Sequence, residues 1–411
     1  MVETSVECIV VGGGIGGAVL ALALGKKGKR VVLLEREPKL AGTARPEVLA
    51  GLTMETFQKL GVGERMVREA AVPLEGLELY EKGPDPVLRL GRDDFKRAGA
   101  SPFSTDPART RTILLEEAQR TGFVEVHRGV EVREILMEGP RVAGVRAVRE
   151  GTFSAWKAGL VVGDDGGESR VRKAMGISLA TREFPLEFLG TVDPAGSSPV
   201  GRMGQARLNP RGLRGGIFGV ISMPLPEERR AFAFILSERA YARFLKDPGR
   251  FYEEASELSP LCSDLKRHRP FPEGFGHFRR PFGHAPRYVS DGAALLGDAA
   301  HPVTPAGGQG ANMSVSDAMA LADVALEVFR QGGEFSARRL ASYEQMRRRP
   351  NERSLQFSIR ANLVFRALKG CPWLMPVLLG YLRRVNHSPN TKARFIRAVS
   401  SAFSTEERST V

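Results

Sequence analysis

The residues best suited to chemistry lie in a glycine-rich turn, Gly12-x-Gly14-x-x-Gly17, which follows an apolar run and precedes small apolar residues. Gly12 permits a sharp turn, Gly14 lets backbone approach a pyrophosphate, and Gly17 lets a helix pack closely on a sheet. The N-terminus of such a helix offers free N–H groups and a positive dipole end to phosphates. Glu35 follows where a carboxylate can accept hydrogen bonds from a ribose. The pattern predicts a dinucleotide site without specifying the dinucleotide.

A second glycine-rich turn lies in VVGDDGGESRVR at 161–172, again after an apolar run. Ser169 is placed to cap a short helix, because its oxygen can accept from the first N–H groups. Asp165, beside Gly166, can either bind ribose hydroxyls or close its own turn by accepting backbone N–H groups. Taken alone, this motif is better explained by the turn.

The third candidate begins with the apolar run Ala293–Leu296, which ends at Gly297-Asp298. A loop rich in proline and glycine leads from there into a helix that starts near Gly310. Asp298 is placed for a hydroxyl of a polyol chain, and the loop glycines let backbone lie flat against a planar ring. We interpret His301, in the same loop, as a structural histidine in preference to a catalytic base.

Strands alternating with helices are expected to position these turns, which is typical of a parallel α/β sheet. The expected elements are strands at Cys8–Val11, Val31–Leu34, Val124–Val132, Arg141–Val148 and Trp156–Val162, and helices at Ala18–Leu24, Met54–Leu60 and Thr110–Thr121. The helix over 110–121 would carry Arg111 in its first turn. Arg45 precedes the helix over 54–60, where it could pair with a pyrophosphate or remain a surface arginine.

A different pattern over 181–280 predicts a second, antiparallel sheet with a phenylalanine-rich core. The expected strands are Phe184–Asp193, Arg214–Met223 and Arg230–Leu236, with helices over Glu238–Leu245 and Tyr252–Leu258. Two short strands, Leu77–Tyr80 and Val87–Leu90, belong to the segment 76–104. The rest of the chain, from Phe335 to Phe403, is expected to be helical and basic.

The most apolar part of this last region is the segment 371–382. It is too short to span a bilayer. Packing on the main body is the simpler interpretation, and contact with a membrane surface or a greasy substrate is the alternative.

Composition excludes several classes of protein. The 411 residues suffice for two or three domains, and 42% hydrophobic and 26% charged residues are ordinary for a globular protein. Three distant cysteines and six histidines without ligand spacing indicate neither disulfides nor a metal site. The net charge of +13 is dispersed, which favours an anionic cofactor, acidic substrate or anionic membrane over nucleic acid. We expect a cytoplasmic protein, either monomer or homodimer.

Taken in order, the three motifs resemble those of the FAD-dependent aromatic hydroxylases, the para-hydroxybenzoate hydroxylase-like flavoprotein monooxygenases. The resemblance covers about residues 6–345. The residues that match in the second and third motifs are Asp165, Gly166, Ser169, Arg172, Gly297, Asp298, Pro305, Gly310, Asn312 and Asp317. Asp164 stands where the family usually carries a small residue, a departure to which we assign little weight.

The resemblance implies FAD as the bound cofactor, with NADPH or NADH as a transient reductant. The residues that it implies for cofactor binding are Gly12, Gly14, Ile15, Gly16, Gly17, Glu35, Arg36, Arg45, Arg111, Val132, Asp165, Gly166, Gly297, Asp298, Pro305, Gly308, Gly310, Ala311 and Asn312. It places Pro305, Gly307, Gly308 and Gly310 at the flavin ring, and it assigns no catalytic side chain and no metal.

The implied fold is a Rossmann-like FAD-binding domain with an inserted antiparallel-sheet substrate domain and a helical C-terminus. The corresponding boundaries are 1–75, 105–180 and 283–345 for the first, 76–104 and 181–282 for the second, and 346–411 for the last. The implied reaction uses O2 and a flavin C4a-hydroperoxide to hydroxylate or epoxidise a small apolar aromatic of the quinone, quinolone or polyketide kind.

Three rival functions use related folds. A reductase of the geranylgeranyl reductase type would act on an isoprenoid without inserting oxygen. A flavin-dependent halogenase would carry a WxWxIP stretch, whereas Trp156 and Trp373 are the only tryptophans here. A non-catalytic dinucleotide-binding protein would not oxidise NAD(P)H.

Overall fold

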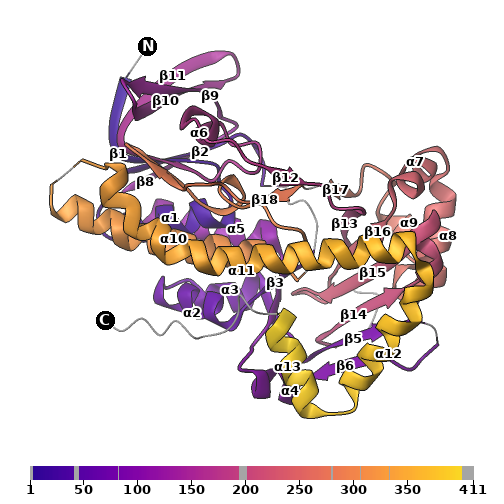
Figure 1. The fold of residues 1–411 in the computed structure, drawn as a ribbon. Coiled ribbons are helices and arrows are strands. Elements are labelled where there is room, and N and C mark those ends of the chain that lie inside the picture. The colour runs from indigo at the N-terminus through magenta and orange to yellow at the C-terminus, as the bar shows by residue number, and fades with distance from the viewer. Residues whose placement is uncertain are drawn as a thin grey trace.

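Two large sheets lie side by side in the computed structural model, and one long helix runs past both (Figure 1). The structure describes residues 3–40, 46–81, 83–193, 201–278, 281–305, 307–332 and 334–399. The two sheets are joined by short connecting elements, so each is built from several separate stretches of the chain.

The first sheet has a parallel centre, because β1 pairs in parallel with both β2 and β11, and β11 pairs in parallel with β20. In spatial order its strands are β19 (Val289–Ser290), β20 (Ala293–Leu295), β11 (Thr152–Gly163), β1 (Glu3–Val11), β2 (Val31–Glu35) and β8 (Val124–Arg128), and the hairpin β9 (Glu131–Glu138) and β10 (Arg141–Arg149) pairs with β11. The Rossmann-like part of the predicted fold is confirmed.

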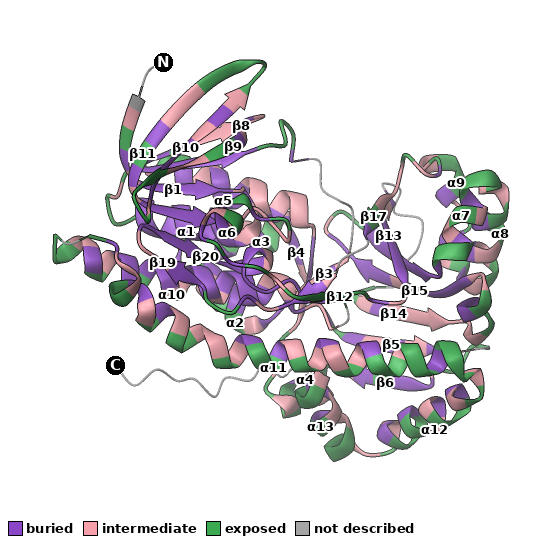
Figure 2. Ribbon diagram, turned by 45° about the horizontal axis from the view of Figure 1, so that its top comes forward, coloured by how far each residue is buried: buried purple, intermediate pink, exposed green. Residues whose placement is uncertain are grey.

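Three helices cover this sheet: α1 (Ile15–Gly25), α5 (Pro107–Arg120) and α10 (Gly310–Arg330). Helix α1 is apolar on all sides and its residues from Gly16 onward are buried, because it packs between the sheet, α5 and α10. Figure 2 shows this half of the molecule with a continuous buried interior. The first glycine-rich turn is therefore anchored from three directions.

The second sheet is antiparallel except for one pair. Its strands, in spatial order, are β17 (Gly276–Phe278), β13 (Glu187–Asp193), β16 (Arg230–Leu236), β15 (Ile217–Pro224), β14 (Met203–Leu208), β5 (Gly76–Tyr80) and β6 (Leu88–Gly91). The exception is β5, which pairs in parallel with β14. Strand β5 reaches this sheet from a distant part of the chain, so a tight hairpin does not dictate its direction.

Three helices pack against the second sheet around a phenylalanine cluster: α7 (Glu238–Lys246), α8 (Pro248–Leu258) and α9 (Leu265–His268). The cluster includes Phe232, Phe234, Phe244 and Phe251, all almost inaccessible to solvent. Phe234 and Phe251 meet edge to face with ring centroids 5.0 Å apart. The predicted phenylalanine-rich core is confirmed.

Short elements fill the space between the sheets and their helices. They are β3 (Glu47–Leu49), β4 (Ala71–Pro73), β7 (Phe103–Thr105), β12 (Thr181–Arg182), β18 (Phe282–Gly283), α2 (Gly51–Lys59), α3 (Gly63–Glu69), α4 (Arg92–Ala98), α6 (Arg170–Ala174), and the 3-10 turns η1 (Pro210–Arg214), η2 (Pro260–Cys262), η3 (Gly297–Ala299) and η4 (Pro372–Leu374).

The chain then forms three further helices, α11 (Ala337–Gly370), α12 (Met375–Asn386) and α13 (Pro389–Val399). Helix α11 runs without a break through the expected boundary at residue 346. Among the described residues, no single helix is long and apolar enough to cross a bilayer; the bent pair of α11 and 372–386 meets that test only when its two parts are taken together.

Several predicted elements start or end elsewhere. The strand predicted over 124–132 is two strands, because Gly129 adopts a φ of +70° between β8 and β9. Helix α5 begins at Pro107 and not at 110, since Asp106 caps it by accepting from the N–H groups of Ala108 and Arg109. Arg111 therefore lies in the second turn, one turn deeper than predicted.

Candidate active site

The sheet register brings the three glycine-rich motifs to one place. Val11, the last residue of β1, lies abreast of Gly163, the last residue of β11. Gly163 in turn pairs with Leu295, the last residue of β20. Because parallel strands end at the same sheet edge, the three turns that follow are neighbours at the carboxyl edge, where ligands bind in open α/β sheets.

The turn after β1 is closely packed by backbone. Gly12 has a φ of +105°, and a Cβ there would lie 2.2 Å from the carbonyl oxygen of Asp164. A Cβ on Gly17 would lie 2.4 Å from the carbonyl oxygen of Gly12. Glycine is therefore required at both positions by the fold itself, before any ligand is considered.

The carboxylate of Glu35 lies against this turn. Its Oε2 accepts from the backbone N–H of Gly13 at 2.8 Å, and its Oε1 accepts from Glu37 N–H at 2.8 Å. The residue is buried at the end of β2. Each oxygen keeps a second lone pair, so the group can still accept from a ribose hydroxyl.

A polar cavity of about 270 Å³ lies among the three turns. Nine of the predicted cofactor residues line it: Gly14, Ile15, Arg111, Gly166, Asp298, Pro305, Gly308, Gly310 and Ala311. No motif predicted the other lining residues, which are Pro46, Glu47, Pro107, Asp164, Val303, Thr304, Gln309 and Ser314. The cavity opens onto the N-terminus of α10, whose first N–H groups have no partner within the helix.

Two buried polar atoms at this cavity have no partner among the described residues, namely Nε of Arg111 and Oε1 of Gln309. A buried donor and a buried acceptor without partners are costly unless a ligand or water completes them. Together with the carboxylate of Asp298 and the α10 N-terminus, they suit a ligand that carries both hydroxyls and phosphates. The residues present therefore fit FAD.

Four predicted glycines lie behind the cavity and shape it by close packing. A Cβ on Gly16 would lie 2.2 Å from Oγ of Ser314, and one on Gly297 would lie 2.6 Å from the same atom. Gly12 and Gly17 complete the group. Gly307, in contrast, lines a second, apolar pocket that is described below.

Two polar residues of the predicted set point elsewhere. Asp165 caps α6, because its Oδ2 accepts from the N–H groups of Arg170 at 2.7 Å and Val171 at 3.3 Å. The Asn312 amide accepts from Ala50 N–H and Thr53 Oγ1 and donates to the carbonyl oxygens of Val48 and Gly308. Those four bonds use its full capacity, so Asn312 holds α2 and β3 against the loop.

The remaining members of the set lie outside the cavity lining. Arg36 has a largely exposed side chain, with its Nε 3.5 Å from Oε1 of Glu37. Val132 is a buried strand residue of β9 that pairs with Ala147. Arg45 lies outside the described residues.

Asp164 occupies the position that Asp165 was predicted to take. Its Oδ2 accepts from the backbone N–H of Gly17 at 2.8 Å, which places the carboxyl at the N-terminus of α1. Burial raises the pKa of Asp164 well above its usual range; the Gly17 hydrogen bond opposes this, and the negative charges of Asp298, Asp165 and Glu35 add to it. The only signal in the sequence was the departure from the family motif.

His301 belongs to a buried ion-pair network centred on Asp317. Its Nε2 lies 2.5 Å from Oδ2 of Asp317, while Oδ1 accepts from Nε of Arg347 at 2.8 Å and from Asn351 Nδ2 at 3.1 Å. His301 and Asp317 are 2% and 0% exposed. The interpretation of His301 as a structural histidine agrees with this geometry, whereas Arg347 carried no motif signal.

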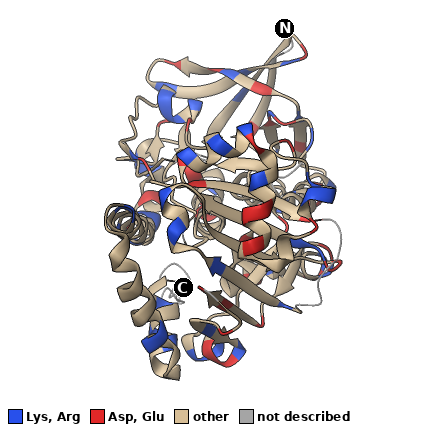
Figure 3. Ribbon diagram, turned by 90° about the vertical axis from the view of Figure 1, so that its right-hand side faces the viewer, with Lys and Arg blue, Asp and Glu red and all other residues tan. Residues whose placement is uncertain are grey.

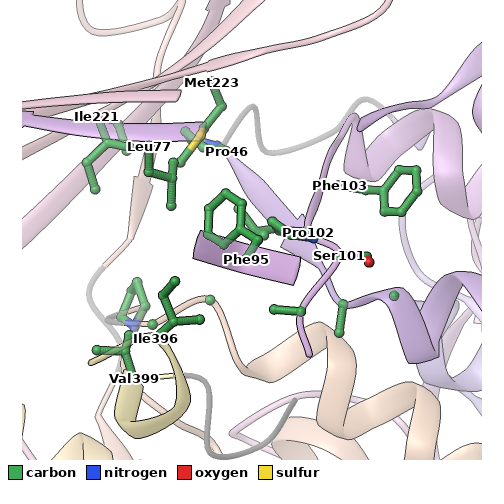
Figure 4. Close-up of a pocket in the computed structure, with 18 of the residues that line it drawn as sticks. Pro46, Leu77, Phe95, Ser101, Pro102, Phe103, Ile221, Met223, Ile396 and Val399 are labelled. Carbon is green, nitrogen blue, oxygen red and sulfur yellow. The ribbon is translucent and has the colours of Figure 1, made fainter. Parts of the chain in front are cut away.

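An apolar pocket of about 710 Å³ adjoins the polar cavity (Figure 4). Strands of the second sheet contribute Leu77, Ile221 and Met223, while Phe95 comes from α4 and Ile396 from α13. Pro46, Pro305 and Gly308 line both the pocket and the cavity. The loop after β20 thus separates a polar space from an apolar one.

A cavity suited to a dinucleotide beside an apolar pocket is typical of a cofactor-dependent enzyme. A family model for the FAD binding domain matches residues 5–358. Since this match covers most of the 411 residues, the chain belongs to that family. It is an FAD-dependent monooxygenase of the aromatic hydroxylase class.

Individual relatives span nearly the whole chain. The chain is 28% identical to 6-methylpretetramide 4-monooxygenase of Streptomyces rimosus over 366 residues, covering 86% of this chain and 82% of the relative. It is 24% identical to 3-demethoxyubiquinol 3-hydroxylase of Escherichia coli, covering 85% and 86%. The solved fold of p-nitrophenol 4-monooxygenase PnpA from Pseudomonas putida is similar, with a TM-score of 0.77, 18% identity and coverage of 98% and 99%.

Proposed function

We propose that this enzyme uses NAD(P)H and O2 to hydroxylate or epoxidise a small apolar aromatic of the quinone, quinolone or polyketide kind. The observation that carries the proposal is the wall shared by the two cavities, formed by Pro46, Pro305 and Gly308. A substrate in the apolar pocket lies directly beside the loop expected at the flavin. Bound FAD supplies the redox chemistry that activates oxygen.

In this proposal the chain binds and orients FAD through several separate groups. The backbone at Gly14 and the N–H groups at the N-terminus of α1 bind the pyrophosphate, and the carboxylate of Glu35 binds the ribose hydroxyls. Asp298 binds the polyol chain, and Arg111 supplies a positive charge from α5. The first N–H groups of α10 face the ring system. The division into an FAD-binding part and a substrate-binding part follows the two sheets.

The pocket lining supports an uncharged substrate. Among its described residues there is no lysine, arginine or histidine, and Glu55 is the one ionisable group. A substrate carboxylate would find no cation there and would lose hydration on entering. The apolar walls also exclude water, which protects reactive oxygen species formed at the site. The names of two relatives, which act on 6-methylpretetramide and 3-demethoxyubiquinol, support such a substrate class.

The test is a screen of phenols, quinolones and quinol precursors for stimulated NAD(P)H oxidation, with 18O2 supplied to the purified FAD-loaded protein. We expect one class to stimulate oxidation and to acquire one labelled oxygen atom per turnover. Reduction of the substrate without label would favour the alternative, a reductase of the geranylgeranyl reductase type. Product oxygen derived from water would contradict monooxygenation.

Asp298→Ala is expected to weaken FAD binding by about 10- to 100-fold, because hydrogen bonds to a charged group contribute about 1.5–3 kcal/mol. The measurement is the dissociation constant from flavin fluorescence titration of the apoprotein. Asp85→Ala, at an exposed position outside the cavity lining, serves as a control. Equal affinities of Asp298→Ala and the unchanged protein for FAD would show that Asp298 does not contribute to FAD binding.

Ala233→Trp is expected to abolish substrate-stimulated NAD(P)H oxidation while FAD remains bound. Ala233 lines the apolar pocket from β16 and does not line the polar cavity, so an indole there fills substrate space only. Leu245→Trp, at an exposed position of α7, is the matched control. Full stimulation in Ala233→Trp would place the substrate elsewhere.

We further propose that the exposed face of α12 meets an anionic lipid surface. Trp373 in η4 and Val377 and Tyr381 in α12 recur every four residues and are 70%, 65% and 54% exposed. Residues 353–399 contain nine lysines and arginines and no acidic residue, and Figure 3 places such basic positions on the C-terminal helices. An apolar stripe with basic flanks is typical of interfacial helices.

Sedimentation with vesicles tests this surface. We expect binding to phosphatidylglycerol vesicles at low salt, weak binding to phosphatidylcholine vesicles, and loss of binding in Trp373→Ser/Val377→Ser. The far smaller exposure of Trp156 lets a blue shift report on Trp373. A concentration-dependent dimer abolished by the same substitutions would instead assign the stripe to a second copy of the chain.

A further inference from the structure

Asp164 is an acidic residue at a site that is suited to the anionic phosphates of a cofactor. Its Oδ2 accepts a hydrogen bond from the N–H of Gly17, the third residue of α1. The N-terminus of such a helix is where a pyrophosphate would bind. A Cβ on Gly14 would meet the same oxygen at 2.4 Å, and Gly14 is the position at which backbone approaches the pyrophosphate. The carboxyl of Asp164 therefore borders the phosphate site.

The surroundings of Asp164 contain more negative than positive charge. Glu35 faces it from β2, Asp298 from η3, and Asp165 from its own turn. Glu47 lines the same cavity from β3. Arg111 is the one cation that lines the same cavity from α5 among the described residues. An ionised Asp164 would repel two phosphates in this setting, since like charges in a desolvated site are unfavourable. A protonated carboxyl would instead offer them a hydrogen-bond donor.

We propose that Asp164 binds FAD in its protonated form, with its O–H directed to the pyrophosphate, so that cofactor binding takes up one proton from solvent at this residue. The proton is bound to Oδ1, which would lie 3.4 Å from a Cβ on Gly14, and Oδ2 keeps the hydrogen bond from Gly17. Burial and the neighbouring acids raise the pKa of Asp164 in the free protein, and the added negative charge of the pyrophosphate would raise it further. A proton is therefore taken up on binding at any pH that lies above the pKa of the free protein and below that of the complex. FAD retention in this chain is therefore linked to pH.

Proton uptake fixes the direction of the effect. Wherever the free protein is ionised at Asp164 and the FAD complex is protonated, the dissociation constant rises about tenfold per pH unit. The pyrophosphate keeps its charge over the same range, so it does not contribute to the slope. Asp164→Asn is neutral at every pH and nearly isosteric, so it should flatten the profile and bind FAD more tightly than the unchanged protein in alkali.

The experiment is an FAD fluorescence titration of apoprotein from about pH 6 to about pH 9, together with calorimetry in buffers of different ionisation enthalpy to count protons. We expect the dissociation constant of the unchanged protein to rise with pH within this range, with about one proton taken up where the rise is steepest, and we expect no uptake by Asp164→Asn. An equal slope in both proteins would overturn the proposal, as would a slope lost only in Asp298→Asn. Neither readout depends on oxygenase activity, so failure of this proposal can be told apart from failure of the proposed substrate class.

Apoprotein stability gives a second readout. A carboxyl whose pKa is raised by folding contributes stability below its unfolded pKa and loses it as pH rises through the folded value. The melting temperature of the unchanged apoprotein should therefore fall more steeply from acid to alkali than that of Asp164→Asn. Asp164→Ala restores the small side chain of the family pattern but removes the acceptor for Gly17 N–H. Its pH profile should also be flat, at a lower melting temperature.

Discussion

Asp317→Ala is expected to lower the free energy of unfolding by about 3–5 kcal/mol, because it removes the buried carboxylate that pairs with both His301 and Arg347. The carboxylate is inaccessible to solvent and binds His301, Arg347, Asn351 and the N–H of Gly297. Removal of a fully engaged carboxylate therefore affects α10, α11 and the loop after β20 together. Urea denaturation of the apoprotein measures the loss.

Glu327→Ala provides the matched control on the same helix. Glu327 pairs with Arg330 at the surface, where such pairs contribute about 0–1 kcal/mol. Similar losses in the two variants would contradict the assignment of a structural network around Asp317.

The same network predicts sensitivity to acid. Burial alone would raise the pKa of Asp317, but the charges and hydrogen bonds of His301 and Arg347 outweigh it and hold the pKa well below its usual range. A carboxyl with a depressed pKa contributes stability above its unfolded pKa and loses it as pH falls through the folded value. The Asp317→Ala penalty should thus shrink in acid.

Gly17→Ala is expected to abolish FAD retention and to destabilise the apoprotein by about 1–3 kcal/mol or more, the usual cost of an overpacked site. The new Cβ would lie 2.4 Å from the carbonyl oxygen of Gly12, which is backbone and cannot rotate away. The measurements are the flavin-to-protein absorbance ratio after purification and thermal unfolding of the apoprotein.

Gly14→Ala makes an informative comparison. Its Cβ would meet only the carboxylate of Asp164, at 2.4 Å, among its three nearest atoms. Asp164→Ala should therefore relieve the strain of Gly14→Ala in the apoprotein, whereas it leaves the Gly12 clash of Gly17→Ala in place. Equal rescue of both glycine variants would contradict this account of the turn.

Short sequence patterns were enough to predict the features that depend on a single turn or helix. The turn at Gly12–Gly17, the acid at the end of β2 and the cap at Ser169 all follow from short-range rules, and the structure has them in place. The orientation of neighbouring side chains was less accessible. Nothing in the stretch Asp164-Asp165 shows which carboxyl faces α1 and which caps α6, because that depends on how β11 meets β1.

Long-range partners were also beyond the sequence. Arg347 completes the Asp317 network from a different helix. The side-chain amide of Asn312 forms hydrogen bonds to β3 and to the start of α2. Strand β5 joins the second sheet beside β14 in parallel, although periodicity sets only the length and faces of a strand. Such contacts are decided by tertiary packing, and no pattern within one element reports them.

The unbroken helix α11 has a mechanical consequence. At 34 residues it is about 51 Å long, given a rise of about 1.5 Å per residue. Near its start Tyr343 bonds to Leu295 at the first sheet, and near its end Leu368 joins the apolar cluster of the second. It acts as a strut that fixes the spacing of the two halves. We therefore expect substrate to enter through local displacement of loops and not through a hinged opening of the two sheets.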